Sequence, residues 1–169
     1  MNIRPLQSAD ASAYQTLRLR GLQECPTAFA SSHDEERDTA LAEVAVRLAP
    51  SPEGGTFGAF EGDTLIGIAS VAREPQRKIA HKALLWGVYV APEHRRRGIS
   101  RQLLEHALAH AFSMSGVRQV NLSVNAANAP AIALYQAMGF EPFGVERGYL
   151  QVDGTLHDEI HMAASRRAQ

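Results

Sequence analysis

The residues best suited to chemistry lie in one short stretch, where three consecutive arginines (Arg95–Arg97) run directly into Gly98. An apolar run ending at Val90 predicts a strand before them, and apolar residues at helical spacing after Gly98 predict a helix. The first turn of a helix presents unpaired backbone N–H groups and partial positive charge, and phosphates bind there for that reason. The stretch therefore predicts a site for an anion with several phosphates, although a lone Arg-x-x-Gly is also typical of a solvated loop.

That first helical turn is one end of a strand–helix–strand unit. Apolar periodicity, glycine and proline predict seven strands, at 2–6, 56–60, 64–72, 82–90, 117–124, 141–150 and 155–163. They also predict four helices: one after a cap at Ser8 or Asp10, one over 31–50, one from Gly98 to just before Gly116, and one from Asn128 to Gly139. The run 82–90 is apolar without alternation, which is typical of a strand covered on both faces. At 169 residues, the chain predicts a single α+β domain over 1–169.

Composition excludes several classes of protein. Lys and Arg number 17 and Asp and Glu 18, so the net charge of −1 argues against a general nucleic-acid binder, which needs a strongly basic face. No apolar run approaches the roughly 20 residues that span a bilayer, and the N-terminal stretch lacks the apolar core of a signal peptide. A single cysteine excludes an internal disulfide framework. We therefore expect a soluble cytoplasmic protein without membrane or nucleic-acid partners.

Two motifs carry a resemblance to a known family. The stretch from Arg95 to Ser100 resembles the acetyl-CoA signature of the GNAT acyltransferase superfamily, (Arg/Gln)-x-x-Gly-x-(Gly/Ala). The stretch NAANAPAIALYQAMGF resembles a second motif of that family, and it supplies Asn125, Asn128, Ala131, Leu134, Tyr135, Gly139 and Phe140. Ser100 stands where the family prefers Gly or Ala, and a serine is still small enough to donate to a phosphate.

The resemblance implies an α+β fold with a mixed, mostly antiparallel seven-stranded sheet flanked by about four helices, the acyl-CoA N-acyltransferase fold. Its two central strands, here 82–90 and 117–124, would splay apart as a pair, and the cofactor would lie between them. Gly87 is the expected place for a bulge, since glycine inside a strand often marks one.

The same resemblance assigns a cofactor site for acetyl-CoA and no metal. Backbone groups near Val88 and Val90 would pair with the pantetheine amides and the thioester carbonyl, and backbone N–H groups of 96–101 would hold the pyrophosphate. The cofactor-binding residues implied are Val88, Tyr89, Val90, Arg95, Arg96, Arg97, Gly98, Ile99, Ser100, Arg101, Asn125, Asn128, Ala131 and Tyr135. Asn128 also suits a helix cap.

The activity implied is an N-acetyltransferase, in which a neutral primary amine attacks acetyl-CoA directly in a ternary complex. Tyr135 matches the tyrosine that protonates the leaving thiolate, although helical spacing alone would make it a half-buried aromatic side chain. The acceptor stays open between a small amine, an amino acid or antibiotic, and a protein amine. By analogy with relatives, a homodimer is the assembly to expect.

The proton acceptor for the amine is not assigned by sequence. Strand 82–90 has no carboxylate, and the candidates are Glu24, His33, Glu35, His81 and His157. The acidic segment 33–38 falls where the family's first helices wall the acceptor site, although acidic residues also suit the first turn of a helix. The alternative function is a CoA-binding sensor or regulatory module with little or no catalysis, and a third is an RNA-binding arginine patch.

Overall fold

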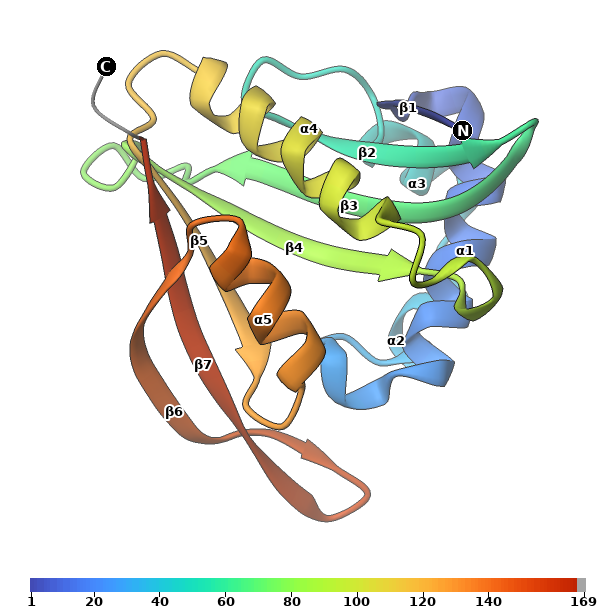
Figure 1. Ribbon diagram of the computed structural model, residues 1–169. Helices are drawn as coiled ribbons and strands as arrows, with labels where there is room; N and C mark the ends of the chain where they lie inside the picture. The colour runs from blue at the N-terminus through green and yellow to red at the C-terminus, as the bar shows by residue number, and fades with distance from the viewer. Residues whose placement is uncertain (167–169) are drawn as a thin grey trace.

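The centre of the protein is one seven-stranded sheet, shown in Figure 1. The computed structural model describes residues 1–166. The strands are β1 (Asn2–Pro5), β2 (Gly54–Glu61), β3 (Thr64–Arg73), β4 (Lys82–Val90), β5 (Gln119–Asn125), β6 (Glu141–Val152) and β7 (Thr155–Ser165), in the order β1-β2-β3-β4-β5-β7-β6. The β4–β5 pair is parallel, and the other neighbouring pairs are antiparallel. The predicted mixed, mostly antiparallel sheet is therefore confirmed.

Helices cover both faces of this sheet. The helices are α1 (Ala11–Glu24), α2 (His33–Glu36), α3 (Leu41–Arg47), α4 (Ile99–Ser113) and α5 (Ala129–Ala137). Helices α4 and α5 lie on one face and α1, α2 and α3 on the other (Figure 1). Within residues 1–166, no helix combines the length and the apolar character needed to cross a membrane.

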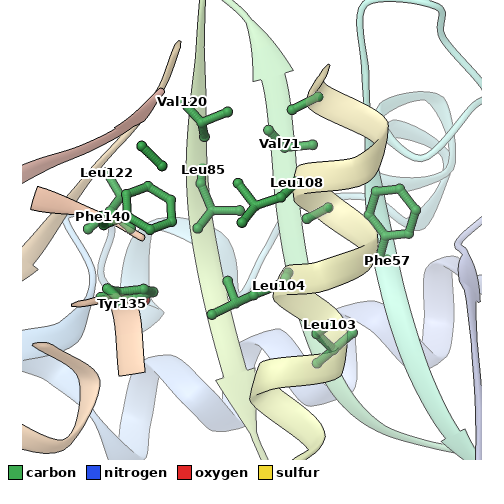
Figure 2. Close-up of a cluster of buried hydrophobic side chains, with 14 of the residues drawn as sticks. Phe57, Val71, Leu85, Leu103, Leu104, Leu108, Val120, Leu122, Tyr135 and Phe140 are labelled. Atoms are coloured by element: carbon green, nitrogen blue, oxygen red, sulfur yellow. The ribbon is translucent and has the colours of Figure 1, made fainter. Parts of the chain in front are cut away.

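The larger core lies under α4, as Figure 2 shows. Leu103, Leu104 and Ala107 are fully buried there against Val71 and Leu85 of the central strands. Apolar residues three, four and seven positions apart share one face of a helix, so the sequence pattern directs this face onto the sheet. Burying a leucine side chain contributes about 1.5–3 kcal/mol, which fixes α4 and the loop before it in place.

Strands β4 and β5 pair only briefly and then diverge. The pairing runs from Lys82 with Gln119 to Leu84 with Asn121, while β4 continues to Val90. Opposite β3, Ser70 pairs with Trp86 and Ile68 pairs with Tyr89, so Gly87 and Val88 both face Ala69. Gly87 has a φ of +66°, a conformation that glycine adopts without strain. The splayed pair and the bulge at Gly87 were both predicted.

Two sequence expectations were wrong. The helix predicted over 31–50 is broken into α2 and α3, and in the break between them the Gln15 amide donates to the Thr39 carbonyl at 2.7 Å. Strand β4 is not covered on both faces, since Leu84 and Trp86 are 40% and 43% exposed. Their exposed face is the wall of the cavity described next.

Candidate functional site

A cavity of about 680 Å³ opens where β4 and β5 diverge. Residues from both strands, from the loop before α4, from α5 and from the segment after α1 line it. The predicted site residues in this lining are Val88, Tyr89, Val90, Arg95, Arg96, Ser100, Asn125, Asn128, Ala131 and Tyr135. Trp86 also lines it, which agrees with its exposure on the open face of β4.

The loop before α4 has the geometry of an anion-binding turn. Arg96 and Gly98 both have positive φ, +62° and +74°, and Gly98 occupies the N-cap of a 15-residue helix. Backbone N–H groups in such alternating turns converge on one point, and the helix adds partial positive charge there. Arg95 is anchored by an Nε hydrogen bond of 2.9 Å to the Val90 carbonyl, and its guanidinium lies 5.7 Å from the Tyr89 ring centroid.

Four predicted site residues do not line the cavity: Arg97, Gly98, Ile99 and Arg101. Arg97 donates to Glu61 at 2.6 Å, and this hydrogen bond lowers the pKa of the Glu61 carboxyl. Arg101 donates to Glu105 at 3.2 Å, while the Ile99 side chain is core and 2% exposed. A ligand at this helical turn would therefore meet the backbone of these residues.

Tyr135 of α5 lies in the cavity wall with 8% of its surface exposed. Its ring packs edge-on against Phe140, with 5.8 Å between the ring centroids. Burial raises the pKa of the Tyr135 phenol to about 12, so its proton stays in place at neutral pH. The tyrosine is positioned by the start of α5, where the Asn128 side chain accepts from Ala131 N–H at 3.2 Å, as predicted for a cap.

Asn125, at the end of β5, connects two segments of the cavity wall by hydrogen bonds. Its amide donates to the Thr27 carbonyl at 3.1 Å, and its oxygen accepts from the Ala127 N–H at 2.9 Å. Thr27 belongs to a 3-10 turn, η2 (Pro26–Ala28), that follows α1. Asn125 therefore ties the segment after α1 to the end of β5, a role that its motif did not indicate.

The five residues considered as proton acceptors all lie outside the cavity lining. Glu24 accepts a hydrogen bond from the Tyr89 hydroxyl at 2.5 Å, which lowers the pKa of this carboxyl. Glu35 closes the capping box with Ser32, and that interaction lowers its pKa. Both carboxylates are therefore committed to structural contacts. Among residues 1–166, no cluster of three or more His, Cys, Asp or Glu side chains is arranged to hold a metal ion.

Sequence reasoning missed two charged residues that line the cavity, Arg18 of α1 and Glu159 of β7. They are 8% and 5% exposed, respectively. Burial raises the pKa of Glu159, and the charges of His161 and Glu146 act on it in opposite directions. For Arg18 the sequence did hold a signal. This residue lies four residues after Tyr14, on the inward face of its helix, where a buried charge is costly unless it is paired.

Comparison with known proteins agrees with this geometry. The model of the Acetyltransferase (GNAT) family matches residues 19–140. The [Ribosomal protein bS18]-alanine N-acetyltransferase of Escherichia coli (strain K12) is 38% identical over 85 residues, which are 50% of this chain and 57% of that protein. The N-alpha-acetyltransferase RimI of Mycobacterium tuberculosis is 36% identical over 108 residues, 64% of this chain and 65% of that protein. The matches thus span less than two thirds of either relative.

The fold recurs in solved structures. That of yncA from Salmonella typhimurium, with its cofactor acetyl-CoA, superposes with a TM-score of 0.81 and 20% identity, over 100% of this chain and 96% of that one. At this identity the likeness shows the fold. The family match covers most of the chain and includes both motifs, and the chain belongs to the Acetyltransferase (GNAT) family.

Proposed function

We propose that the protein is an acetyl-CoA-dependent N-acetyltransferase that transfers the acetyl group directly to a primary amine. The observation that carries the proposal is the cavity between β4 and β5, with an anion-binding turn at one end and a buried, protonated Tyr135 in its wall. Family membership and the acetyl-CoA-bound fold neighbour support the choice of cofactor.

In this proposal the cofactor lies along the open edge of β4. The pyrophosphate binds the N–H groups of 96–101 and the side chains of Arg95 and Arg96. The pantetheine arm runs between the strands. There it takes the place of a partner strand and pairs with backbone groups at Val88 and Val90 of β4. Asn128 and Ala131 flank it from the start of α5.

The chemistry needs charge stabilisation, the loss of two protons from the nitrogen and the gain of one proton by the sulfur. As the neutral amine attacks the thioester carbonyl, a backbone N–H at the bulge stabilises the oxyanion, and losing one such donor costs about 2.7–4 kcal/mol. Collapse of the tetrahedral intermediate breaks the C–S bond, and the thiolate takes the Tyr135 proton. The Tyr135 phenol is protonated at neutral pH, and the proposal places the thioester sulfur within hydrogen-bond reach of it.

We propose Glu159 as the proton acceptor for the amine, directly or through one water. It is a carboxylate in the cavity wall, and burial shifts its pKa upward, toward the pH at which a base operates best. The ammonium gives its first proton to Glu159 before attack, and Glu159 releases it to solvent. After attack the nitrogen loses its second proton, which passes through water to the Tyr135 phenolate, so the products are the amide, the free thiol and one proton in solution. A carboxylate in the cavity wall supports this proposal over a non-catalytic CoA-binding module, for which the missing carboxylate on strand 82–90 was one reason.

We propose the class of acceptor from the names of the curated relatives. The named activities of the two curated relatives point to an α-amine, such as the N-terminal alanine of a ribosomal protein. The homodimer and the cytoplasmic location remain predictions from sequence.

The test measures thiol release from acetyl-CoA across a panel of amines and N-terminal peptides, together with calorimetric binding of acetyl-CoA. Binding followed by acceptor-dependent thiol release is the expected result. Tight binding with no turnover for any acceptor would favour the regulatory module. A salt-sensitive RNA complex that CoA does not displace would favour the arginine patch.

A further inference from the structure

A second cavity, of about 360 Å³, lies on the α1–α3 face of the sheet and meets the first one. The two cavities share Arg18, Ser31 and Trp86 in their linings. Hydroxyl groups of Thr56 and Ser70, hydrogen-bonded to each other at 2.9 Å, lie in the lining of the second cavity. The cofactor proposed above does not fill this space, so it is available to the acceptor.

Arg18 stands at the junction and is held rigidly. Its Nε and Nη2 donate to the two carboxylate oxygens of Glu36 at 3.0 and 2.8 Å. Its guanidinium also lies 4.8 Å from the ring centroid of Phe29. Burial raises the pKa of Glu36, but the hydrogen bonds and the charge of Arg18 outweigh this effect and leave the pKa below its usual value. The pair is therefore ionised, and its geometry is fixed.

The third nitrogen of Arg18, Nη1, is directed at the bulge. A Cβ atom built on Gly87 would lie 3.9 Å from this nitrogen and 3.8 Å from the Ser70 hydroxyl. Among the side-chain hydrogen bonds within residues 1–166, Nη1 takes part in none. The Arg18 side chain is 10% exposed, and Nη1 is not among the buried polar atoms that lack a partner, so this nitrogen is accessible from the cavity. The arrangement thus presents a pre-positioned hydrogen-bond donor beside the backbone at which acetyl transfer is proposed.

We infer that Nη1 of Arg18 binds a carboxylate or carbonyl oxygen of the acceptor, and that the acceptor is therefore an α-amino acid or the N-terminal residue of a peptide, with its side chain in the second cavity. The inference rests on the proposed function. In both acceptors the oxygen is carried by the carbon next to the one that bears the amine, so one compact group satisfies Arg18 while the amine faces the thioester. Glu159, on the other wall, complements the ammonium.

The charge of the site suits a zwitterion better than a polyamine. Arg18 and Glu36 neutralise each other, so Nη1 of Arg18 acts as a hydrogen-bond donor and the pair adds no net charge to the site. Glu159 supplies one negative charge for one ammonium. Glu36 is the one carboxylate among the described residues that line the second cavity, and it is already paired with Arg18, so a second ammonium would find no free anionic partner there. A plain amine would leave Nη1 without a partner, and sites built to hydrogen-bond a substrate discriminate strongly against analogues that lack the group.

The experiment uses matched acceptors, so its first readout needs no variant. For alanine, leucine, methionine and phenylalanine, kcat/KM per unprotonated amine is measured with the free L-amino acid, its amide and its decarboxylated amine. The better of the two oxygen-bearing forms is expected to exceed the amine by about 10- to 100-fold, the loss expected for a hydrogen bond to a charged group. The amide arm distinguishes a peptide carbonyl from a free carboxylate. Equal rates for amine and oxygen-bearing forms would overturn the inference.

A double variant, Arg18→Gln with Glu36→Gln, assigns the preference to Arg18 while leaving no buried charge unpaired. It is expected to reduce the preference to below about threefold, a residual that corresponds to less than one ordinary hydrogen bond. Because the acceptors differ in basicity, the preference is compared between proteins, where that difference cancels. The control is Arg20→Gln, on the same helix, which pairs with Glu93 outside both cavities and should keep the full preference. An unchanged preference in the double variant would remove Arg18 from the acceptor site.

Calorimetry separates this inference from the proposed function. The same acceptors are titrated into the protein alone, and acetyl-CoA is titrated in a separate experiment. Failure of acetyl-CoA to bind would overturn the proposed function whatever the acceptors do. Acetyl-CoA binding and transfer to plain amines, with amino acids and amides neither bound nor acetylated, would overturn only the inference about Arg18.

Discussion

The two ends of the central cavity are built in different ways. The proposed cofactor end would use backbone from two short, continuous stretches, 95–101 and 125–135, each at the start of a helix. The proposed acceptor end would use side chains that are far apart in sequence and that line the two cavities, Arg18 on α1, Glu36 on α2 and Glu159 on β7.

This difference shows which kind of site can be predicted from a sequence. A backbone site depends on local conformation, which glycine, proline and capping residues encode within a few positions. A side-chain site depends on where the sheet and the helices bring distant residues, and the hydrogen bond from Asn125 to Thr27 ties the turn after α1 to the end of β5.

The largest effect is expected at the cofactor end. Replacing Gly98 by glutamate adds a negative charge at the proposed phosphate position and should weaken acetyl-CoA binding by about 100-fold or more, since several charge-assisted hydrogen bonds are lost together. The matched control is Gly154→Glu in the β6–β7 turn, because both glycines have positive φ and open space around a built Cβ. Calorimetry gives both affinities, and equal binding by the two variants would contradict the placement of the phosphates.

Tyr135→Phe tests the point where the two ends meet. We expect kcat to fall by about 10²-fold, because one proton transfer is lost, while acetyl-CoA affinity changes little and packing against Phe140 is retained. With a pKa of about 12, Tyr135 should give no descending limb in the pH–rate profile below about pH 11. Single-turnover rates at saturating acceptor provide the measurement, and an unaltered rate would exclude the phenol as acid.

Glu159→Gln tests the acceptor end and should lower kcat/KM by about 10- to 100-fold. In the wild-type protein the rate should fall as pH drops through the raised pKa of Glu159, and the variant should lack that limb. Acceptor titrations from pH 5 to 9 measure it. The same limb in both proteins would assign the base to another group.

The stability of the Glu159→Gln variant checks the same residue independently. A carboxyl whose pKa is raised on folding favours the folded state most when protonated, so its contribution declines as pH rises through the folded pKa. The variant is therefore expected to be more stable than wild type at pH 7, with the difference closing below about pH 4.5. Urea unfolding at several pH values gives this difference, and a variant that is less stable at pH 7 would refute the burial argument.

The smallest effect sharpens the cofactor end itself. Arg96 lines the cavity, whereas Arg97 is paired with Glu61 and lies outside it. Arg96→Gln should weaken acetyl-CoA binding by about tenfold, one charge-assisted hydrogen bond, and Arg97→Gln by less than about threefold. Equal losses would mean that the Arg97 side chain turns to the phosphate when the cofactor binds.

Much of the fold was predictable because it is locally encoded. The bulge at Gly87, the start of α4 at Gly98 and the Asn128 cap each depend on one residue type at one position. The break between α2 and α3 was missed because the helical pattern continues through it. In the break, the Gln15 side chain of another helix donates to the Thr39 carbonyl, and helical periodicity does not report such a contact.

The sequence by itself determined the family, the order of the elements and the two helix starts that form the proposed cofactor end, because these follow from residues within one turn or one strand. Only the tertiary structure decided which charges enter the cavity. Arg18 and Glu159 resemble many other surface residues until packing buries them, and burial is a property of the whole chain, since it depends on what the neighbouring elements exclude from water.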